Sequence, residues 1–187
     1  MVCNRVCGIL IIIMLILGKT LANKSILSLR TGSPVGLLLG PVINPDNLKI
    51  EGWHVENGIS HSAGVLLAQD IRDILPQGLV VDDQEALSDP KELIRLKPIL
   101  DLNFELVGKH VVTENKKRLG KVIDFAFDKD SSFIGKIHVS QSLVKSFSGG
   151  ELMIDRAQVI EVNNREIVVN EATVQEGSAV PAPALAQ

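Results

Sequence analysis

The stretch FAFDKDSSFIGKIHV, residues 125–139, has a counterpart of equal length in PVINPDNLKIEGWHV, residues 41–55. Each begins with apolar residues, crosses a polar turn, and returns through alternating apolar residues to His-Val. Alternation on both sides of a turn rich in Asn, Asp and Pro predicts two strands joined by that turn. We therefore expect the chain to contain the same β unit twice.

The similarity continues beyond these two stretches. A loop that is longer in the second copy aligns LVVDD, residues 79–83, with IVVNE, residues 167–171. Small units of short strands must close or be covered by a partner to hide their strand edges. The sequence therefore predicts a mainly β protein with two small tandem barrels. Upstream, where the second copy holds an additional hairpin, two residue pairs align: Gly32 with Gly108 and Val35 with Val111.

These patterns divide the chain into five parts. An apolar segment at 1–23 precedes the first barrel at 24–86, and a connector at 87–101 leads to the second barrel at 102–172. The last part, at 173–187, is rich in Ala and Pro and is predicted to be disordered.

The connector is expected to contain a short helix near residues 89–98 that joins the two barrels. Ser88 or Asp89 is a suitable N-terminal cap, and Pro90 fits the first helical position. Pro98 is expected to limit or kink this helix.

Composition excludes several classes of function. Aromatic residues make up 3% of the chain, which argues against a stacking platform for single-stranded nucleic acid. The net charge of −3 argues against a strong overall grip on phosphate backbones. Both cysteines, Cys3 and Cys7, lie near the N-terminus, so the rest of the chain holds no disulfide framework or cysteine zinc site.

The N-terminal run CGILIIIMLILG, residues 7–18, leaves three alternatives open. Translation that starts at Met14 gives a cytoplasmic protein whose first residues approach a strand. A secretory signal with Arg5 before its apolar part and cleavage after Ala22 gives a secreted protein. Retention of residues 5–17 gives a membrane-anchored protein, although the run is shorter than the roughly 20 residues that a spanning helix needs.

The segment LVGKHVVTENKKRLGKVIDFAFDKDSSFIGKIHV, residues 106–139, resembles the PRC-barrel signature. The first copy is more degenerate and lacks the Leu-Gly-x-Val-x-Asp hairpin. The whole chain is similar to tandem PRC-barrel proteins of bacteria, and related domains occur in ribosome maturation factors and in the reaction-centre H subunit. The resemblance implies a docking module rather than a catalyst. The signature residues are Leu106, Gly108, Lys109, Val111, Leu119, Gly120, Val122, Asp124 and Asp128.

Several residues of types that form catalytic or metal sites in other proteins are expected to have only structural roles in this chain. His54 and His138 occupy matching strand positions, opposite to their apolar neighbours, so we expect both to face solvent; the alternative is a metal or proton site across a pseudo-twofold axis. The acidic turns lack the ligand spacing of a calcium loop. Gly149-Gly150 lacks the Lys of a phosphate-binding loop, and Ser146 and Ser148 lack a nucleophile motif. We expect no enzyme activity and no cofactor or metal.

The charged stretch ENKKRLGK is predicted to be a hairpin tip, and its alternative role is a solvated turn. On a tip, cations would contact acidic protein groups or RNA phosphates. The predicted function is a non-catalytic adaptor that docks onto a protein or a ribonucleoprotein. The alternatives are a ribosome maturation factor and an envelope structural module anchored through residues 5–17. The candidate contacts are Lys116, Lys117, Arg118 and Lys121.

Overall fold

The computed structural model describes residues 14–140 and 151–170. The expectations for residues 1–13, for the loop with Ser146, Ser148 and Gly149-Gly150, and for the tail at 173–187 therefore lie outside the described residues. The elements are β1 (Leu15–Leu17), β2 (Ser25–Ser28), β3 (Pro34–Asn44), β4 (Lys49–Asn57), β5 (Ala63–Leu67), β6 (Ile71–Leu75), β7 (Gly78–Val81), β8 (Leu87–Ser88), α1 (Lys97–Leu102), β9 (His110–Thr113), β10 (Arg118–Asp128), β11 (Ile134–Ser140), β12 (Glu151–Asp155), β13 (Val159–Val162) and β14 (Glu166–Val169).

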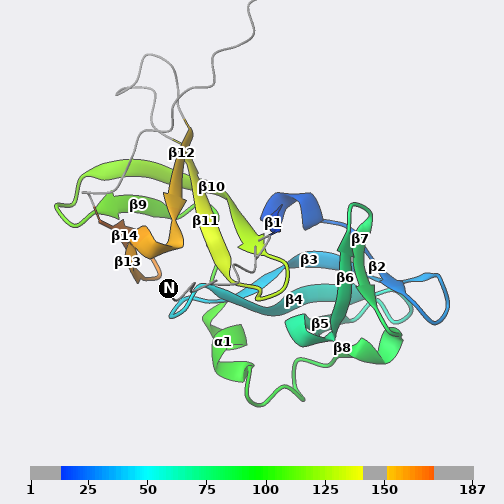
Figure 1. Cartoon of the computed structure of the whole chain (residues 1–187). Coiled ribbons are helices and arrows are strands. Elements are labelled where there is room, and N and C mark those ends of the chain that lie inside the picture. The colour runs from blue at the N-terminus through cyan, green and yellow to red at the C-terminus, as the bar shows by residue number, and fades with distance from the viewer. Residues whose placement is uncertain (1–13, 141–150, 171–187) are drawn as a thin grey trace, which may run out of the picture.

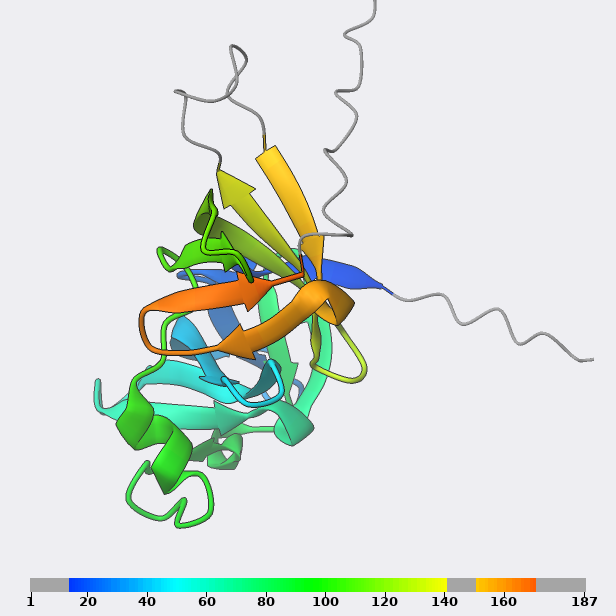
Figure 2. The same cartoon turned by 90° about the vertical axis from the view of Figure 1, so that its left-hand side faces the viewer.

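The strands form two sheets, so the prediction of a mainly β protein is confirmed (Figure 1). The first sheet has the strand order β6-β7-β2-β3-β4-β5-β8. The second sheet has the order β12-β11-β10-β9-β14-β13, and β1 pairs with β10 outside this path. In the view of the molecule turned by 90°, the second sheet lies above the first (Figure 2).

Each sheet curls, but neither closes as a barrel, which corrects the prediction of two closed barrels. The 3₁₀ turn Ala68–Asp70 joins β5 to β6, and Arg156–Gln158 joins β12 to β13. These strands stand far apart in the strand order, so a three-residue connection between them forces the sheet to curl. The turns redirect the chain instead of folding it back as a hairpin, and within the described residues no ladder joins β5 to β6 or β12 to β13.

The two sheets share one strand order and one register. β2 pairs in parallel with β7, and β9 pairs in parallel with β14; the other ladders are antiparallel. Ile43 lies opposite Ile50 in the first sheet, as Phe127 lies opposite Ile134 in the second. Register shifts also recur at the same places, between Leu38 and Gly40 and between Val122 and Asp124. The alignment of 41–55 with 125–139 therefore holds residue by residue in three dimensions.

The two sheets meet at the matching turns, in an arrangement with pseudo-twofold symmetry. The Ile50 N–H donates to the Ser132 carbonyl, and the Ile134 N–H donates to the Leu48 carbonyl, both at 2.9 Å. Next to these turns, the rings of Trp53 and Phe127 lie 5.8 Å apart. Both sheets contribute to one continuous buried core, and Trp53 packs at the contact between the halves.

The repeat extends further upstream than the sequence alignment shows. The Asn23 N–H donates to the Leu38 carbonyl, and the Gly108 N–H donates to the Val122 carbonyl. Both donors have a positive φ, 57° for Asn23 and 88° for Gly108, a conformation that Gly and Asn adopt most easily. The motif LVGK at 106–109 therefore has its counterpart in LANK at 21–24.

This equivalence corrects two sequence expectations about the first copy. Gly36 pairs with Ile26 as Gly120 pairs with Val111, so the residue that matches Val111 is Ile26 and not Val35. A hairpin joins β2 to β3 just as a hairpin joins β9 to β10, so the second copy has no additional hairpin. The hairpin expected to be missing from the first copy is present there with Val35 and Gly36 in place of Leu119 and Gly120.

The described end of the apolar segment is part of the fold. β1 pairs with the distal half of β10, with Leu17 opposite Ala126 and Leu15 opposite Asp128. Leu21 follows in the 3₁₀ turn Gly18–Leu21 and is 2% exposed. The predicted boundary at residue 24 therefore excludes residues that complete the core.

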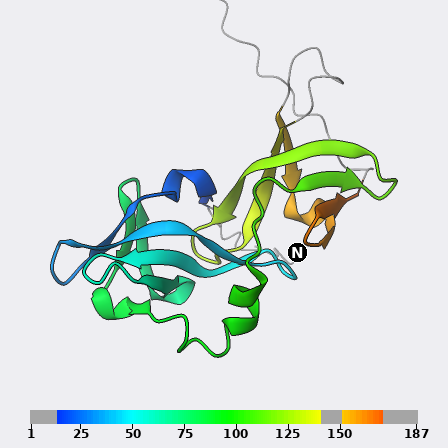
Figure 3. The ribbon, with the colours of Figure 1, turned by 180° about the vertical axis from the view of Figure 1, so that it is seen from behind.

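The connector between the sheets contains one short helix, placed later than predicted (Figure 3). Residues 90–96 form turns, and α1 begins at Lys97, so Pro98 lies in its first turn and not at its end. Proline is tolerated there because the first helical N–H groups have no intrahelical partner. Asn103, with φ 42°, ends the helix.

Candidate functional site

The predicted basic cluster lies on the tip of the β9–β10 hairpin, at the end of the second sheet that is remote from the first (Figure 1). The tip is built by Thr113, which accepts the Lys116 N–H and donates its own N–H to the Lys117 carbonyl. Lys116 adopts a positive φ of 59°. The residues Lys116, Lys117, Arg118 and Lys121 are all exposed.

Most of the signature residues hold the second sheet together. Leu106, Val111 and Val122 are at most 1% exposed, and Leu119 packs against the same core. Gly120 is required by a close approach of two strands, because a Cβ there would lie 2.0 Å from the Ser140 carbonyl oxygen.

Two charged signature residues anchor turns. The Lys109 ammonium lies 4.6 Å from the centre of the Phe104 ring and donates to the Asn164 carbonyl at 2.7 Å. Burial lowers the pKa of Lys109. Asp128 accepts hydrogen bonds from the hydroxyl and the N–H of Ser131, which lower the pKa of its carboxyl.

Asp124 fixes the N-terminal segment onto the second sheet. It is 2% exposed, and its Oδ1 accepts the Lys19 N–H at 3.0 Å while the Lys19 ammonium lies 3.7 Å from Oδ2. Beside it, Gly18 lies so close to Phe125 that a Cβ would be 2.4 Å from the ring. The distal edge of β10 is therefore occupied by residues from the start of the described chain.

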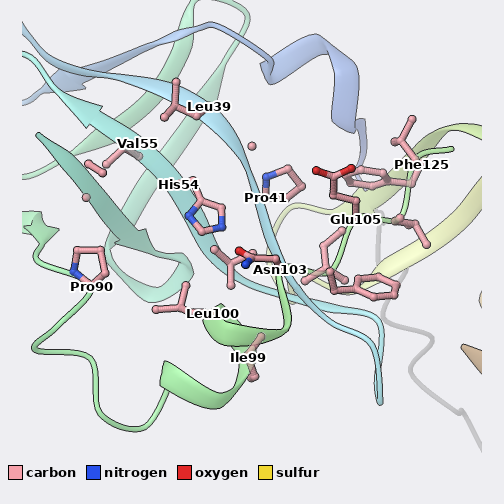
Figure 4. A pocket seen from close by; sticks show the side chains of 18 residues that line it. Leu39, Pro41, His54, Val55, Pro90, Ile99, Leu100, Asn103, Glu105 and Phe125 are labelled. Carbon is pink, nitrogen blue, oxygen red and sulfur yellow. The ribbon is translucent and has the colours of Figure 1, made fainter. Parts of the chain in front are cut away.

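The equivalent edge of β3 is open. Within the part of the chain that the structure describes, no strand pairs with Val42–Asn44 on the side away from β4. A pocket of about 570 Å³ lies along this edge, between β3 and the segment that follows α1 (Figure 4). Its lining is mostly apolar and includes Leu39, Pro41, Val42, Leu100 and Val107, with His54, Asn103 and Glu105 as polar members.

The two matching histidines have different surroundings. His54 lines the pocket and is partly buried, and this burial lowers the pKa of its imidazole. His138 is 14% exposed and its Nδ1 lies 2.5 Å from Oε1 of Glu151. The expectation that both face solvent is therefore wrong, because His54 is partly buried beside the pocket and His138 is paired with Glu151 of β12. Among the described residues no group of three His, Cys, Asp or Glu side chains is placed to hold a metal.

Residues 102–176 match the family model of the PRC-barrel domain. The chain contains a PRC-barrel domain. The match begins at the end of α1 and covers every strand from β9 to β14, which is the second sheet without β1. No curated protein matches the chain. In residues 14–140 and 151–170, no helix has the length and apolar character needed to cross a membrane.

Sequence reasoning missed the pocket, although two signals for it were present. Pro41 and Pro45 stand two residues on either side of Ile43, which is typical of a strand edge without a partner. The stretch LDLNFEL, residues 100–106, alternates like a strand but begins within a helix. The pocket lies between these two segments.

Proposed function

We propose that the protein is a non-catalytic adaptor that docks onto a protein or ribonucleoprotein partner, and that its first sheet is a second PRC-type unit. The duplication is supported by the common strand order, by the common register from 41–55 to 125–139, and by the paired hydrogen bonds of Asn23 and Gly108. Each half covers part of the other's apolar surface through the contact of Trp53 with Phe127.

The observation that carries the adaptor proposal is the exposed cationic tip of the PRC-barrel domain. The signature residues near it are used for packing and turns, whereas Lys116, Lys117 and Arg118 are exposed at the end of the sheet. Cations on a rigid hairpin set the register of a complex with an acidic surface and accelerate its formation. The chain has a net charge of −3, so this tip is a local exception to its overall charge.

The test is affinity purification from native cells with the wild-type chain and with the variant Lys116→Ala, Lys117→Ala, Arg118→Ala. We expect the variant to lose about tenfold in affinity for the recovered partner, because each exposed charge pair contributes about 0.2–1 kcal/mol. The matched control replaces Lys91, Arg95 and Lys97, which are exposed on the connector, by Ala. The control removes the same charge and should leave recovery unchanged.

Recovery that is equal for the wild type and the tip variant would remove the tip from the mechanism. Nuclease treatment and a high-salt wash identify the class of partner. Loss of the complex after nuclease treatment, together with salt-sensitive co-sedimentation with ribosomal particles, would identify a ribonucleoprotein. A complex that survives nuclease treatment identifies a protein partner.

A further inference from the structure

The N-terminal segment and the connector are equivalent parts of the repeat. Leu21 and Leu106 are both buried and precede the matched residues Asn23 and Gly108, so Leu15–Leu17 corresponds to Leu100–Leu102. The first of these segments is strand β1 on the edge of β10, whereas the second lies in α1 and leaves the edge of β3 open. The pocket therefore occupies the place that a strand fills in the other half.

The differences between the two edges explain why only one is filled by the chain itself. Asp124, which binds the Lys19 N–H, has Gly40 as its counterpart, so the first sheet offers no carboxylate at that position. The Lys129 N–H donates to the Met14 carbonyl, and its counterpart is Pro45, which has no N–H.

The open edge nevertheless retains the groups needed to bind a strand. The Asn44 carbonyl accepts from Leu48 and thus faces β4, so the backbone of Ile43 faces the opposite way, toward the open edge. Ile43 can therefore donate one hydrogen bond and accept one, and Pro41 and Pro45 can only accept. Prolines on an edge weaken strand pairing, so this edge should hold a strand less tightly than the edge of β10 holds β1.

We propose that this groove receives an extended apolar segment of a partner protein, which adds as an antiparallel strand beside Val42–Asn44. The inference rests on the proposed adaptor function and names the partner's binding element. β1 is the template for the occupant, because Leu15–Leu17 fills the equivalent edge of β10. Leu39 and Val107 line the groove and are 50% and 49% exposed, so they are apolar surface that such a segment would cover.

The connector does not form a strand on this edge because its residues form helix α1 instead. Pro98 lies in the first turn of α1 and Asn103 ends it with a positive φ. Phe104 corresponds to Lys19, and Gly40 corresponds to Asp124. The Phe104 N–H therefore has no carboxylate on β3 of the kind that accepts the Lys19 N–H. The groove thus remains accessible to a segment supplied by another molecule.

The test uses the full chain and a fluorescein-labelled peptide, LILGKTLAKK, which carries residues 15–22 and two solubilising lysines. We expect saturable binding by fluorescence anisotropy. Leu39→Asp should weaken binding at least tenfold, because it places a charge on the apolar wall of the groove. The matched control Ile123→Asp changes the corresponding exposed residue of β10 and should leave binding unchanged. Urea titration of both variants checks that they remain folded.

A second variant is expected to strengthen binding. Gly40→Asp supplies the acceptor that Asp124 supplies to β1, and a Cβ at Gly40 meets no atom within 4 Å, so the change fits the fold. We expect the affinity for the peptide to rise severalfold. A peptide with proline in place of the second residue, LPLGKTLAKK, should bind more weakly because it lacks a backbone donor.

Three results would overturn the inference. The first is the absence of saturable binding, and the second is binding that depends on Ile123 and not on Leu39, which would mean that the peptide replaces β1 on β10. The third is binding only after Leu100 and Leu102 are replaced by Ala, which would show that the connector occupies the groove in solution. If the peptide fails to bind while the tip variant still loses its partner, the adaptor function stands and only the groove assignment fails.

Discussion

Strands β3 and β10 occupy the same position in their sheets, yet their distal edges differ. The edge of β10 is covered by β1 and fixed by the hydrogen bond from Lys19 to Asp124. The edge of β3 has Gly40 at the matching position and is bordered by a pocket. The comparison shows that two sheets with the same strand order can differ in whether the chain itself covers an edge, through a few contacts at that edge.

The covered edge also links the two halves of the chain. β1 belongs to the second sheet, but the residues that follow it enter β2 of the first sheet. Lys129 of the second half forms an ion pair with Asp73 of the first, which raises the pKa of the lysine and lowers that of the carboxyl. The open edge of β3 lies outside these contacts and remains accessible to other molecules.

The largest effect is expected from removal of the segment that covers β10. A chain shortened to begin at Asn23, the product of cleavage after Ala22, lacks β1 and the buried Leu21. Loss of a buried leucine side chain alone costs about 2–5 kcal/mol, a large part of the stability of a small domain. Urea unfolding should therefore show strong destabilisation, with protection from hydrogen exchange lost first in β10.

The control for this truncation is a chain that begins at Met14, which keeps β1, Gly18 and Leu21. It should unfold at a much higher urea concentration than the chain that begins at Asn23. Equal midpoints for the two chains would mean that β1 and Leu21 contribute nothing to the folded state, and the contrast between the two edges would then be lost.

The strands could be predicted because the pattern that defines them is local. The alternation in 41–55 and 125–139 located both long hairpins and gave their mutual alignment. The match of Leu21 with Leu106 was missed because Asn23 replaces the glycine of the motif and because the apolar run before it is typical of a targeting segment. Asn23 adopts the positive φ that the motif requires, so the geometry is kept although the sequence no longer shows the glycine of the motif.

The groove and the position of the helix depend on contacts that a local pattern does not contain. The alternating residues 100–106 predict a strand, but a strand requires a suitable edge, and Gly40, Pro41 and Pro45 make the edge of β3 a poor one. The first part of this segment becomes α1. Pairing of strands across the two halves is therefore the step at which single-sequence reasoning failed.

A moderate effect is expected from Asp124→Ala, which removes the anchor of the covered edge. The Lys19 N–H loses the charged carboxylate of the buried Asp124 as its acceptor, and a hydrogen bond to a charged group contributes about 1.5–3 kcal/mol. Asp124→Asn keeps an acceptor and should lose less. Urea unfolding measures both, and an alanine variant as stable as the wild type would show that the bond to Lys19 does not hold β1 in place.

The smallest effect concerns the matching turns and depends on pH. Hydrogen bonds from Ser131 lower the pKa of Asp128 in the folded protein below its ordinary value of 3.8, so its stabilising contribution is complete above that pH and is lost as the pH falls through the folded pKa. In the other half, Asn44 stands in place of Asp128 and accepts a turn hydrogen bond from the Asp46 N–H without titrating. Asp128→Asn should therefore reduce the loss of unfolding free energy in acid, and Asn44→Asp should increase it.

Since Asp73 and Asp82 also have lowered pKa values, the measurement is the difference in unfolding free energy between variant and wild type as the pH is lowered. If that difference for Asp128→Asn does not change with pH, the two turns are held by the same uncharged contacts and the contrast between them is one of sequence alone.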